Sequence, residues 1–167
     1  MALQLFKIAS TTVESPVTSI EFTNIPSGYT DLYLVHSLRT NRSGETEEGV
    51  EIQFNSSTAN FTSRRLIGNG STVASQTIVA REAGIVPGGN ATTNTFGNVS
   101  IYIPNYTSAN NKSFSVDGVM ENNATLSYTD LSAGLWSNTA AITNIKLTGY
   151  SSGSFVANST ATLYGVL

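Results

Sequence analysis

Apolar and polar residues alternate along almost the whole chain, and this period of two is the feature that most limits how it can fold. Apolar residues spaced i, i+3, i+4 and i+7 are never sustained over several helical turns. Alternation places successive side chains on opposite faces of an extended strand, so the pattern predicts half-buried β-strands and no long helix. We expect strands at Leu3–Ile8, Val17–Phe22, Leu32–Leu38, Val50–Phe54, Arg64–Ile67, Thr72–Arg81, Asn98–Ile103, Ser113–Val119, Thr125–Trp136, Ile142–Thr148 and Ala161–Val166.

The number and spacing of these short strands indicate how they pack. Many short strands separated by turn-rich segments are typical of a sandwich or a barrel. Only 11% of the residues are charged, which suits two packed antiparallel sheets with small polar side chains outside. We therefore expect an all-β fold, an antiparallel β-sandwich of jelly-roll type. Residues 1–167 are expected to form a single domain, because domains cluster near about 100–150 residues.

Two segments are predicted to be exposed loops rather than strands. Ile85–Thr95 contains Pro87 followed by two glycines, and Thr40–Gly49 is rich in polar and acidic residues. Both compositions favour turns, and neither segment is long enough to be a linker between domains.

Composition also excludes several classes of function. The chain has no Cys and a single His, which excludes disulfide scaffolds, thiol nucleophiles and Cys-type zinc sites. A net charge of −3 argues against a nucleic-acid-binding protein. No apolar run approaches the ~20 residues of a membrane helix, and Met1–Ile8 does not have the pattern of a signal peptide. We expect no cofactor, no nucleic acid and no membrane as partner.

His36 is the only imidazole that could act as a catalytic base. It alternates with Leu32, Leu34 and Leu38, so we expect it to face the core or a subunit contact. A catalytic role would need a nucleophile and an orienting carboxylate nearby, and no Gly-x-Ser-x-Gly elbow is present. The pattern favours a structural histidine, and we predict that the protein is not an enzyme.

Four carboxylates lie close together in the sequence, at Glu45, Glu47, Glu48 and Glu51. Carboxylates bind Ca²⁺, but this cluster lacks the spaced Asp/Asn pattern of a calcium loop. In an extended strand Glu47 and Glu48 would also point to opposite faces. We expect a solvated loop or an acidic face that meets a basic partner, and no metal site. A depolymerase is the third class considered, and no defined acid pair supports it.

Five of the eight basic residues are arginines between positions 39 and 81: Arg39, Arg42, Arg64, Arg65 and Arg81. Guanidinium groups pair with carboxylates at interfaces, and charges on edge strands also prevent wrong strand pairing. Both interpretations remain open at this point.

The aromatic residues suggest a second kind of surface. Tyr102, Tyr106, Tyr128, Trp136, Tyr150 and Tyr164 could stack on sugars. Trp136 lies in a dense apolar stretch, however, so a position in the core is favoured for it. Carbohydrate binding stays an alternative, with Tyr106 and Trp136 as candidate stacking residues.

Motifs spread over nearly the whole chain carry a resemblance to a known family. They are Ile25–Leu32 (IPSGYTDL), Ser37–Thr40 (SLRT), Ile52–Asn55 (IQFN), Leu66–Gly70 (LIGNG), Ile101–Tyr106 (IYIPNY), Gly134–Ile142 (GLWSNTAAI) and Ser159–Val166 (STATLYGV). In this order, and with the STATLYG ending, the chain resembles small β-rich structural proteins of tailed bacteriophages. These are capsid decoration (cement) proteins or domains of tail-fibre proteins.

The resemblance implies a virion structural protein and supplies no catalytic residues to carry over to this chain. The predicted strands begin at residue 3 and end at residue 166, which is expected to leave no segment for attachment to a fibre. We therefore expect a decoration protein that is made in the host bacterial cytoplasm, binds the major capsid protein on the outer shell and stabilises it. A closed homo-oligomer is expected, a trimer rather than a dimer, with Arg39, Arg42, Arg64 and Arg65 as candidate interface residues. The alternative is a tail-fibre or capsid-surface adhesin module that binds a host glycan or receptor.

Overall fold

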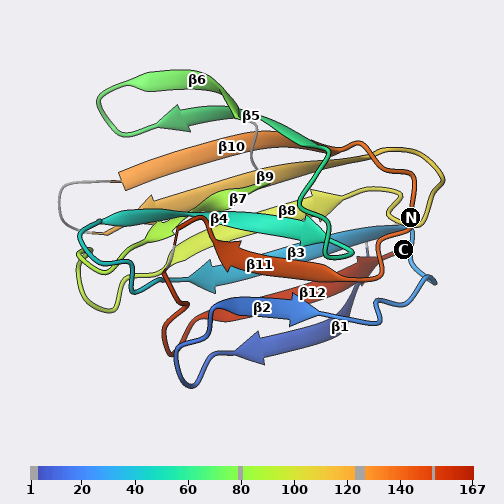
Figure 1. Ribbon diagram of the computed structural model, residues 1–167, viewed down its shortest axis with the longest axis horizontal. Coiled ribbons are helices and arrows are strands. Elements are labelled where there is room, and N and C mark those ends of the chain that lie inside the picture. The colour runs from blue at the N-terminus through green and yellow to red at the C-terminus, as the bar shows by residue number, and fades with distance from the viewer. Residues whose placement is uncertain (1–3, 79–80, 123–126, 152) are drawn as a thin grey trace.

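The computed structural model describes residues 4–78, 81–122, 127–151 and 153–167, and all of its regular structure is β (Figure 1). Among the described residues, no helix is long and apolar enough to cross a membrane. The strands are β1 (Leu5–Thr12), β2 (Ser19–Phe22), β3 (Asp31–Leu38), β4 (Glu47–Phe54), β5 (Phe61–Gly68), β6 (Val73–Ile78), β7 (Glu82–Pro87), β8 (Gly97–Ile103), β9 (Lys112–Glu121), β10 (Ser127–Trp136), β11 (Ile145–Gly149) and β12 (Thr160–Val166).

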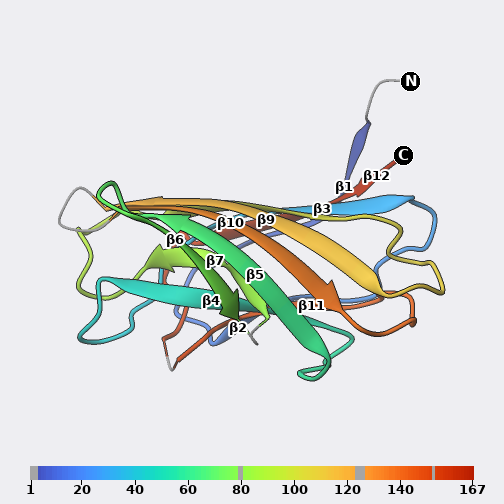
Figure 2. The ribbon, with the colours of Figure 1, turned by 90° about the horizontal axis from the view of Figure 1, so that it is seen from above.

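The strands form two sheets that pack face to face. The large sheet has eight strands in the order β1-β12-β3-β8-β9-β10-β5-β6, and the small sheet has four in the order β2-β11-β4-β7. Each pair of hydrogen-bonded neighbours is antiparallel. The predicted all-β, antiparallel sandwich is confirmed, and the jelly-roll arrangement in particular stays a prediction. In Figure 2, β5 and β6 bend away from the rest of the large sheet toward the small one.

Alternating side chains build the core between the sheets. Along β3 the burial alternates strictly, with Leu32, Leu34, His36 and Leu38 inside, as the sequence predicts. Every second residue of β9 is buried in the same way. Opposite these strands, the small sheet contributes buried apolar side chains such as Ile52. Burial of this shared apolar surface is the main favourable term in folding.

An aromatic cluster fills one end of the core. The ring of Phe54 from the small sheet lies 5.4–5.6 Å, centroid to centroid, from Phe61, Phe114 and Trp136 of the large sheet. Gly134 makes room for this cluster, because a Cβ atom there would lie 2.1 Å from the Phe114 ring. The core position favoured for Trp136 is therefore confirmed.

The predicted loop Ile85–Thr95 is wrong over its first three residues, which belong to β7. All six residues of β7 are buried, so its sequence does not alternate. Gly84 has a positive φ of 98°, a conformation that few other residues adopt, and the register with β4 shifts beside it, between Gly49 and Glu51. A strand that is buried on both faces shows no apolar–polar alternation, and the Gly and Pro at its irregular positions are typical of loops, so the sequence pattern did not identify β7.

The other differences are at strand ends. The predicted loop Thr40–Gly49 ends earlier than expected, because β4 already begins at Glu47. Ile142 is buried in a loop before β11, and Val17 forms an isolated bridge with Phe155 before β2. Leu3, residues 79–80 and residues 125–126 of the predicted strands lie outside the described part of the chain.

Candidate functional site

A cavity of about 690 Å³ lies where the β5–β6 hairpin bends over the edge of the small sheet. Alternate residues of the hairpin line it, including Arg65 and Ile67 on β5 and Gln76 on β6. Glu82 of β7 and Tyr128 of β10 complete this side of its wall. Because side chains alternate along each strand, these residues share one face of the large sheet or the rim of the small sheet.

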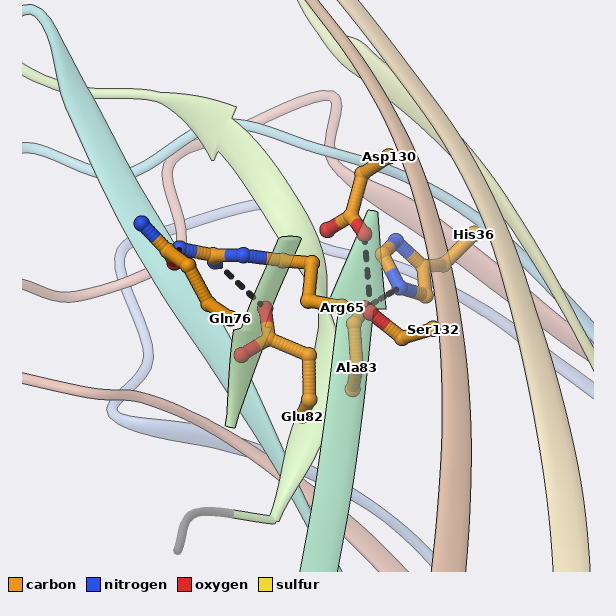
Figure 3. A network of polar contacts seen from close by, with 7 residues as sticks. All are labelled: His36, Arg65, Gln76, Glu82, Ala83, Asp130 and Ser132. Carbon is orange, nitrogen blue, oxygen red and sulfur yellow. Dashed lines mark hydrogen bonds and ion pairs between the residues drawn. The ribbon is translucent and has the colours of Figure 1, made fainter. Parts of the chain in front are cut away.

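An ion pair joins the hairpin to the small sheet inside this cavity. Arg65 Nη1 lies 3.3 Å from Glu82 Oε1, and Arg65 Nη2 donates to Gln76 Oε1 at 2.7 Å (Figure 3). Burial raises the pKa of the Glu82 carboxyl to about 7, although Arg65 opposes this shift. A second ion pair, between Arg81 and Glu51, lies on the same edge. The Arg65–Glu82 pair fixes the hairpin against β7, and the Arg81–Glu51 pair joins the residue before β7 to β4.

A separate group of polar side chains lies next to this ion pair, on the core side (Figure 3). Ser132 Oγ donates to Asp130 Oδ1 at 2.8 Å, and burial raises the pKa of Asp130. His36 Nε2 donates to the Ala83 carbonyl at 3.0 Å, which assigns the proton to Nε2. Burial lowers the pKa of His36 to about 4, despite that hydrogen bond.

The contacts of His36 do not form a catalytic triad. Its Nδ1 atom is buried without a hydrogen-bond partner among the described residues, so neither ring nitrogen bonds to a hydroxyl or a carboxylate. A general base must contact both its nucleophile and an orienting group. His36 instead fixes β7 against β3, which confirms its expected position in the core.

The acidic cluster divides between the two faces of β4, as the alternation predicts. Glu48 is fully buried and accepts a hydrogen bond from the Ser151 amide at 2.8 Å. Glu47 and Glu51 are half-buried on the other face, and Glu45 lies before the strand, 3.7 Å from Arg42. Within the described ranges, no three His, Asp or Glu side chains are grouped closely enough to hold a metal ion.

The four candidate interface arginines do not form one patch. Arg39 is buried, and its guanidinium donates to the carbonyls of Ala91 and Thr92 at 2.9 and 2.7 Å. It therefore supports the loop before β8 from inside. Arg65 lies in the cavity and Arg42 at its wall. Arg64 is exposed on the opposite face of β5, where its Nη1 donates to the Ser63 carbonyl at 3.1 Å. Of the four arginines, it is the one that lies on the outside of the large sheet.

The two candidate stacking residues are both in the interior. Trp136 and Tyr106 have exposed fractions of 1% and 0%, and the Tyr106 hydroxyl donates to the Pro26 carbonyl. A sugar ring needs an open aromatic face, so burial removes both residues as stacking platforms. Tyr150, at the cavity wall, is 64% exposed and offers such a face.

The outer face of the large sheet carries a cluster of exposed apolar side chains over β5, β10 and β9. We use "outer face" for this region, which comprises Arg64, Leu66, Leu131, Leu135 and Val119. Leu131 lies opposite Leu66 on one side and Asp117 on the other. Leu66, Leu131 and Val119 are each 47–48% exposed. The alternation that buries one face of these strands leaves the other face uncovered.

Sequence reasoning did not identify Glu82 or Gln76 as site residues. Gln76 lies in a predicted strand that is too long, and Glu82 lies just beyond the predicted end of that strand. Their partner Arg65 comes close to them only because the hairpin folds over the small sheet. The signal that could have found them is the alternation of Arg65 with Ser63 and Ile67, which places the guanidinium on the inner face of β5. No protein-family model matches the sequence, and a search of curated proteins finds no match.

Proposed function

We propose that this protein is a bacteriophage virion structural protein, a capsid decoration protein that binds the outer shell and stabilises it. The observation that carries the proposal is the outer face, where Leu66 and Leu131 lie side by side on a broad sheet. Contiguous exposed apolar residues on a soluble chain mark a surface that contacts another protein. The sequence resemblance to phage virion proteins supplies the partner, the major capsid protein.

Few charged residues surround this apolar cluster, as expected for a surface that contacts another protein. Arg64 and Asp117 are the charged residues that lie next to the leucines in the register of β5, β10 and β9. Interfaces place apolar residues at the centre and polar groups at the rim. Arg64 is therefore the one candidate interface arginine that we retain, because Arg39 and Arg65 have internal partners and Arg42 lies at the cavity wall beside Glu45.

The strand order supports the jelly-roll part of the prediction. When β5–β6 and β9–β10 are set aside, two four-stranded sheets remain, ordered β1-β12-β3-β8 and β2-β11-β4-β7. Successive strands then alternate between the sheets, except that β4 and β7 are neighbours in the small sheet, and this is the strand order of a jelly roll built from two Greek keys. The hairpins β5–β6 and β9–β10 extend one sheet, and together they carry the whole outer face.

Single substitutions on the outer face test this proposal. Leu131→Glu places a charge on an exposed side chain and should cost at most about 1 kcal/mol of stability, because Asp117 lies opposite it. The fold should be kept, but the affinity for the shell should fall at least ~10-fold, because an unpaired charge in an apolar contact is costly. Thr12→Glu, an exposed position at the far end of the same sheet, is the matched control. Phage heads carrying Leu131→Glu should lose DNA at a lower temperature than heads with Thr12→Glu. Equal occupancy and equal release temperature would overturn the outer face as the contact.

The cavity favours a second candidate, an adhesin module that binds a host glycan. Tyr150, Tyr128 and Gln76 line it together with carboxylates, and aromatic and amide groups are the chemistry that recognises sugars. Glycan-array binding that is lost in Tyr150→Ala, with an unchanged fold, would support this function. Binding retained in that variant would exclude the cavity as its site.

We propose no catalytic role for the cavity. Hydrolysis of a glycoside needs one protonated acid and one free carboxylate facing the same bond. Glu82 and Glu51 are instead engaged by Arg65 and Arg81. Turnover of a host polysaccharide that is lost in Glu82→Gln would contradict this assignment.

A further inference from the structure

Each sheet ends in two edge strands, and three of these four edges carry features that prevent pairing with another chain. An edge strand exposes unpaired N–H and C=O groups, and proteins protect it with charges, bulges, short length or coverage. On β1, Lys7 lies beside an irregularity in the register. On β2 the strand has only four residues and includes Glu21. On β7 all residues are buried, and Pro87 ends the strand.

The fourth edge strand, β6, is six residues long and has no charge, bulge or covering segment among the described residues. Its sequence, Val73–Ile78 (VASQTI), contains no charged residue and no Pro. Its register with β5 runs without a bulge. Val73 is 74% exposed, and four further residues of the strand are exposed. Figure 1 shows β6 as the outermost strand of the large sheet. Such a strand is a template for adding another strand.

The turn before β6 determines which backbone groups face the free side. The Asn69 N–H donates to the Thr72 carbonyl at 3.2 Å, so the carbonyl of Thr72 points toward β5. Successive residues of an antiparallel strand direct their N–H and C=O groups to opposite sides. The backbone groups of Val73, Ser75 and Thr77 therefore point away from β5, toward the free side.

We propose that β6 pairs with β6 of a second copy of this chain, in antiparallel orientation about a two-fold axis at Ser75. Residues opposite one another in an antiparallel pair share a face of the sheet, so the axis must pass through a residue position. With Ser75 opposite Ser75, Val73 lies opposite Thr77, and each free N–H and C=O of these residues gains a partner. A register centred on Gln76 would leave Val73 without a partner inside β6.

The side chains of the paired strands are compatible with this register. Val73 opposite Thr77 is a pair of β-branched residues, which favours cross-strand packing. Ala74 lies opposite Gln76, and no like charges meet, because β6 has no charged residue. The paired edges would join two eight-stranded sheets into one continuous sheet, with both outer faces on the same side.

This inference predicts a dimer, whereas a trimer was expected from the sequence. A cyclic trimer built by pairing strand edges would require β6 to pair with a different edge of the next copy, and the other three edges are protected. The dimer does not depend on the virion role, because it uses the β6 edge and not the outer face. A strand pair of this length is a small interface, so we expect reversible association over roughly 1 µM to 1 mM.

Cysteine cross-linking tests the register directly, because the chain has no cysteine of its own. Ser75→Cys places two thiols on the two-fold axis, about 5.5 Å apart between Cα atoms, which a disulfide can span. Under mild oxidation this variant should form a covalent dimer at least ~10-fold faster than Thr62→Cys, an exposed position on β5. Equal rates for the two variants would overturn the pairing.

Sedimentation of the cysteine-free protein provides the second test. Ser75→Pro removes an N–H that β5 does not use, so the strand should stay in the sheet. Thr77→Lys adds a charge to the same edge without constraining the backbone. Both variants should raise the dissociation constant of the dimer at least ~10-fold, with unchanged circular dichroism. A wild-type protein that stays monomeric at ~1 mM, or a dimer unaffected by Thr77→Lys, would refute the proposal.

Discussion

Replacement of Glu82 by Gln should change how stability depends on pH, and the structure gives both the sign and the size of the change. Burial raises the pKa of Glu82 from 4.5 to about 7. As pH rises from 4.5 to 7, the carboxyl ionises in the unfolded chain before it does so in the folded one. The unfolded state is stabilised, so the free energy of unfolding falls across this window. At about 1.4 kcal/mol per pH unit, the fall approaches about 3 kcal/mol.

His36 acts in the opposite direction over nearly the same window. Burial lowers its pKa from 6.5 to about 4, so as pH falls from 6.5 to 4 the unfolded chain takes up a proton that the folded chain does not. Stability is therefore lost toward low pH, again by about 3 kcal/mol. In the wild-type protein the two contributions nearly cancel. Asp130, whose pKa is also raised by burial, adds to the effect of Glu82.

Glu82→Gln removes the contribution of Glu82 to the pH dependence and leaves that of His36. Its free energy of unfolding should rise with pH between 4.5 and 6.5, and its difference from wild type should change by about 3 kcal/mol between pH 4.5 and 7.5. Urea denaturation followed by the fluorescence of Trp136, the single tryptophan, measures this difference. Glu14→Gln, at an exposed position, is the control and should run parallel to wild type. Parallel curves for Glu82→Gln would refute the reasoning.

Three further substitutions test the packing that positions the site. Arg39→Met removes the donor that holds the Thr92 carbonyl and should lower the free energy of unfolding by about 2 kcal/mol. Amide hydrogen exchange should become faster only in the loop before β8, and unchanged exchange there would contradict the role of Arg39. Gly134→Ala forces a Cβ atom against the Phe114 ring and should cost about 1–3 kcal/mol in thermal unfolding, and a neutral result would be inconsistent with the packing. Asn55→Ala leaves the Thr143 amide without its acceptor and should lower the free energy of unfolding by about 1–2 kcal/mol. Asn55→Asp should restore only part of this loss, because Asp keeps the acceptor but lacks the N–H that Asn55 donates to the Ala141 carbonyl.

The fold could be predicted from the sequence for strands that bury one face and expose the other. On β3 and β9 one face meets the core and the other meets solvent or small polar neighbours, so alternation in the sequence gives both the strand and its buried face. The position of His36 followed from the same pattern. On β7 both faces are buried, which removes the alternation, and Gly84 and Pro87 make the segment look like a loop.

The candidate site depends on contacts between distant segments, which the sequence pattern does not contain. Arg39 has a charge that predicts exposure, yet it is buried because carbonyls more than fifty residues away along the chain accept its hydrogen bonds. Arg65 meets Glu82 only because the hairpin bends over the small sheet. The exposed leucines of the outer face follow from alternation, but their contiguity follows from the register between β5 and β10.

The central claim is that this protein attaches to a phage shell through the outer face of its large sheet. The most direct test is cosedimentation of the purified protein with phage heads that lack it, followed by cryo-electron microscopy of the heads. Ordered density at regular positions on the shell, with β5, β9 and β10 against the major capsid protein, is the predicted result. Density confined to the tail, or no bound protein, would contradict the claim and favour the adhesin module.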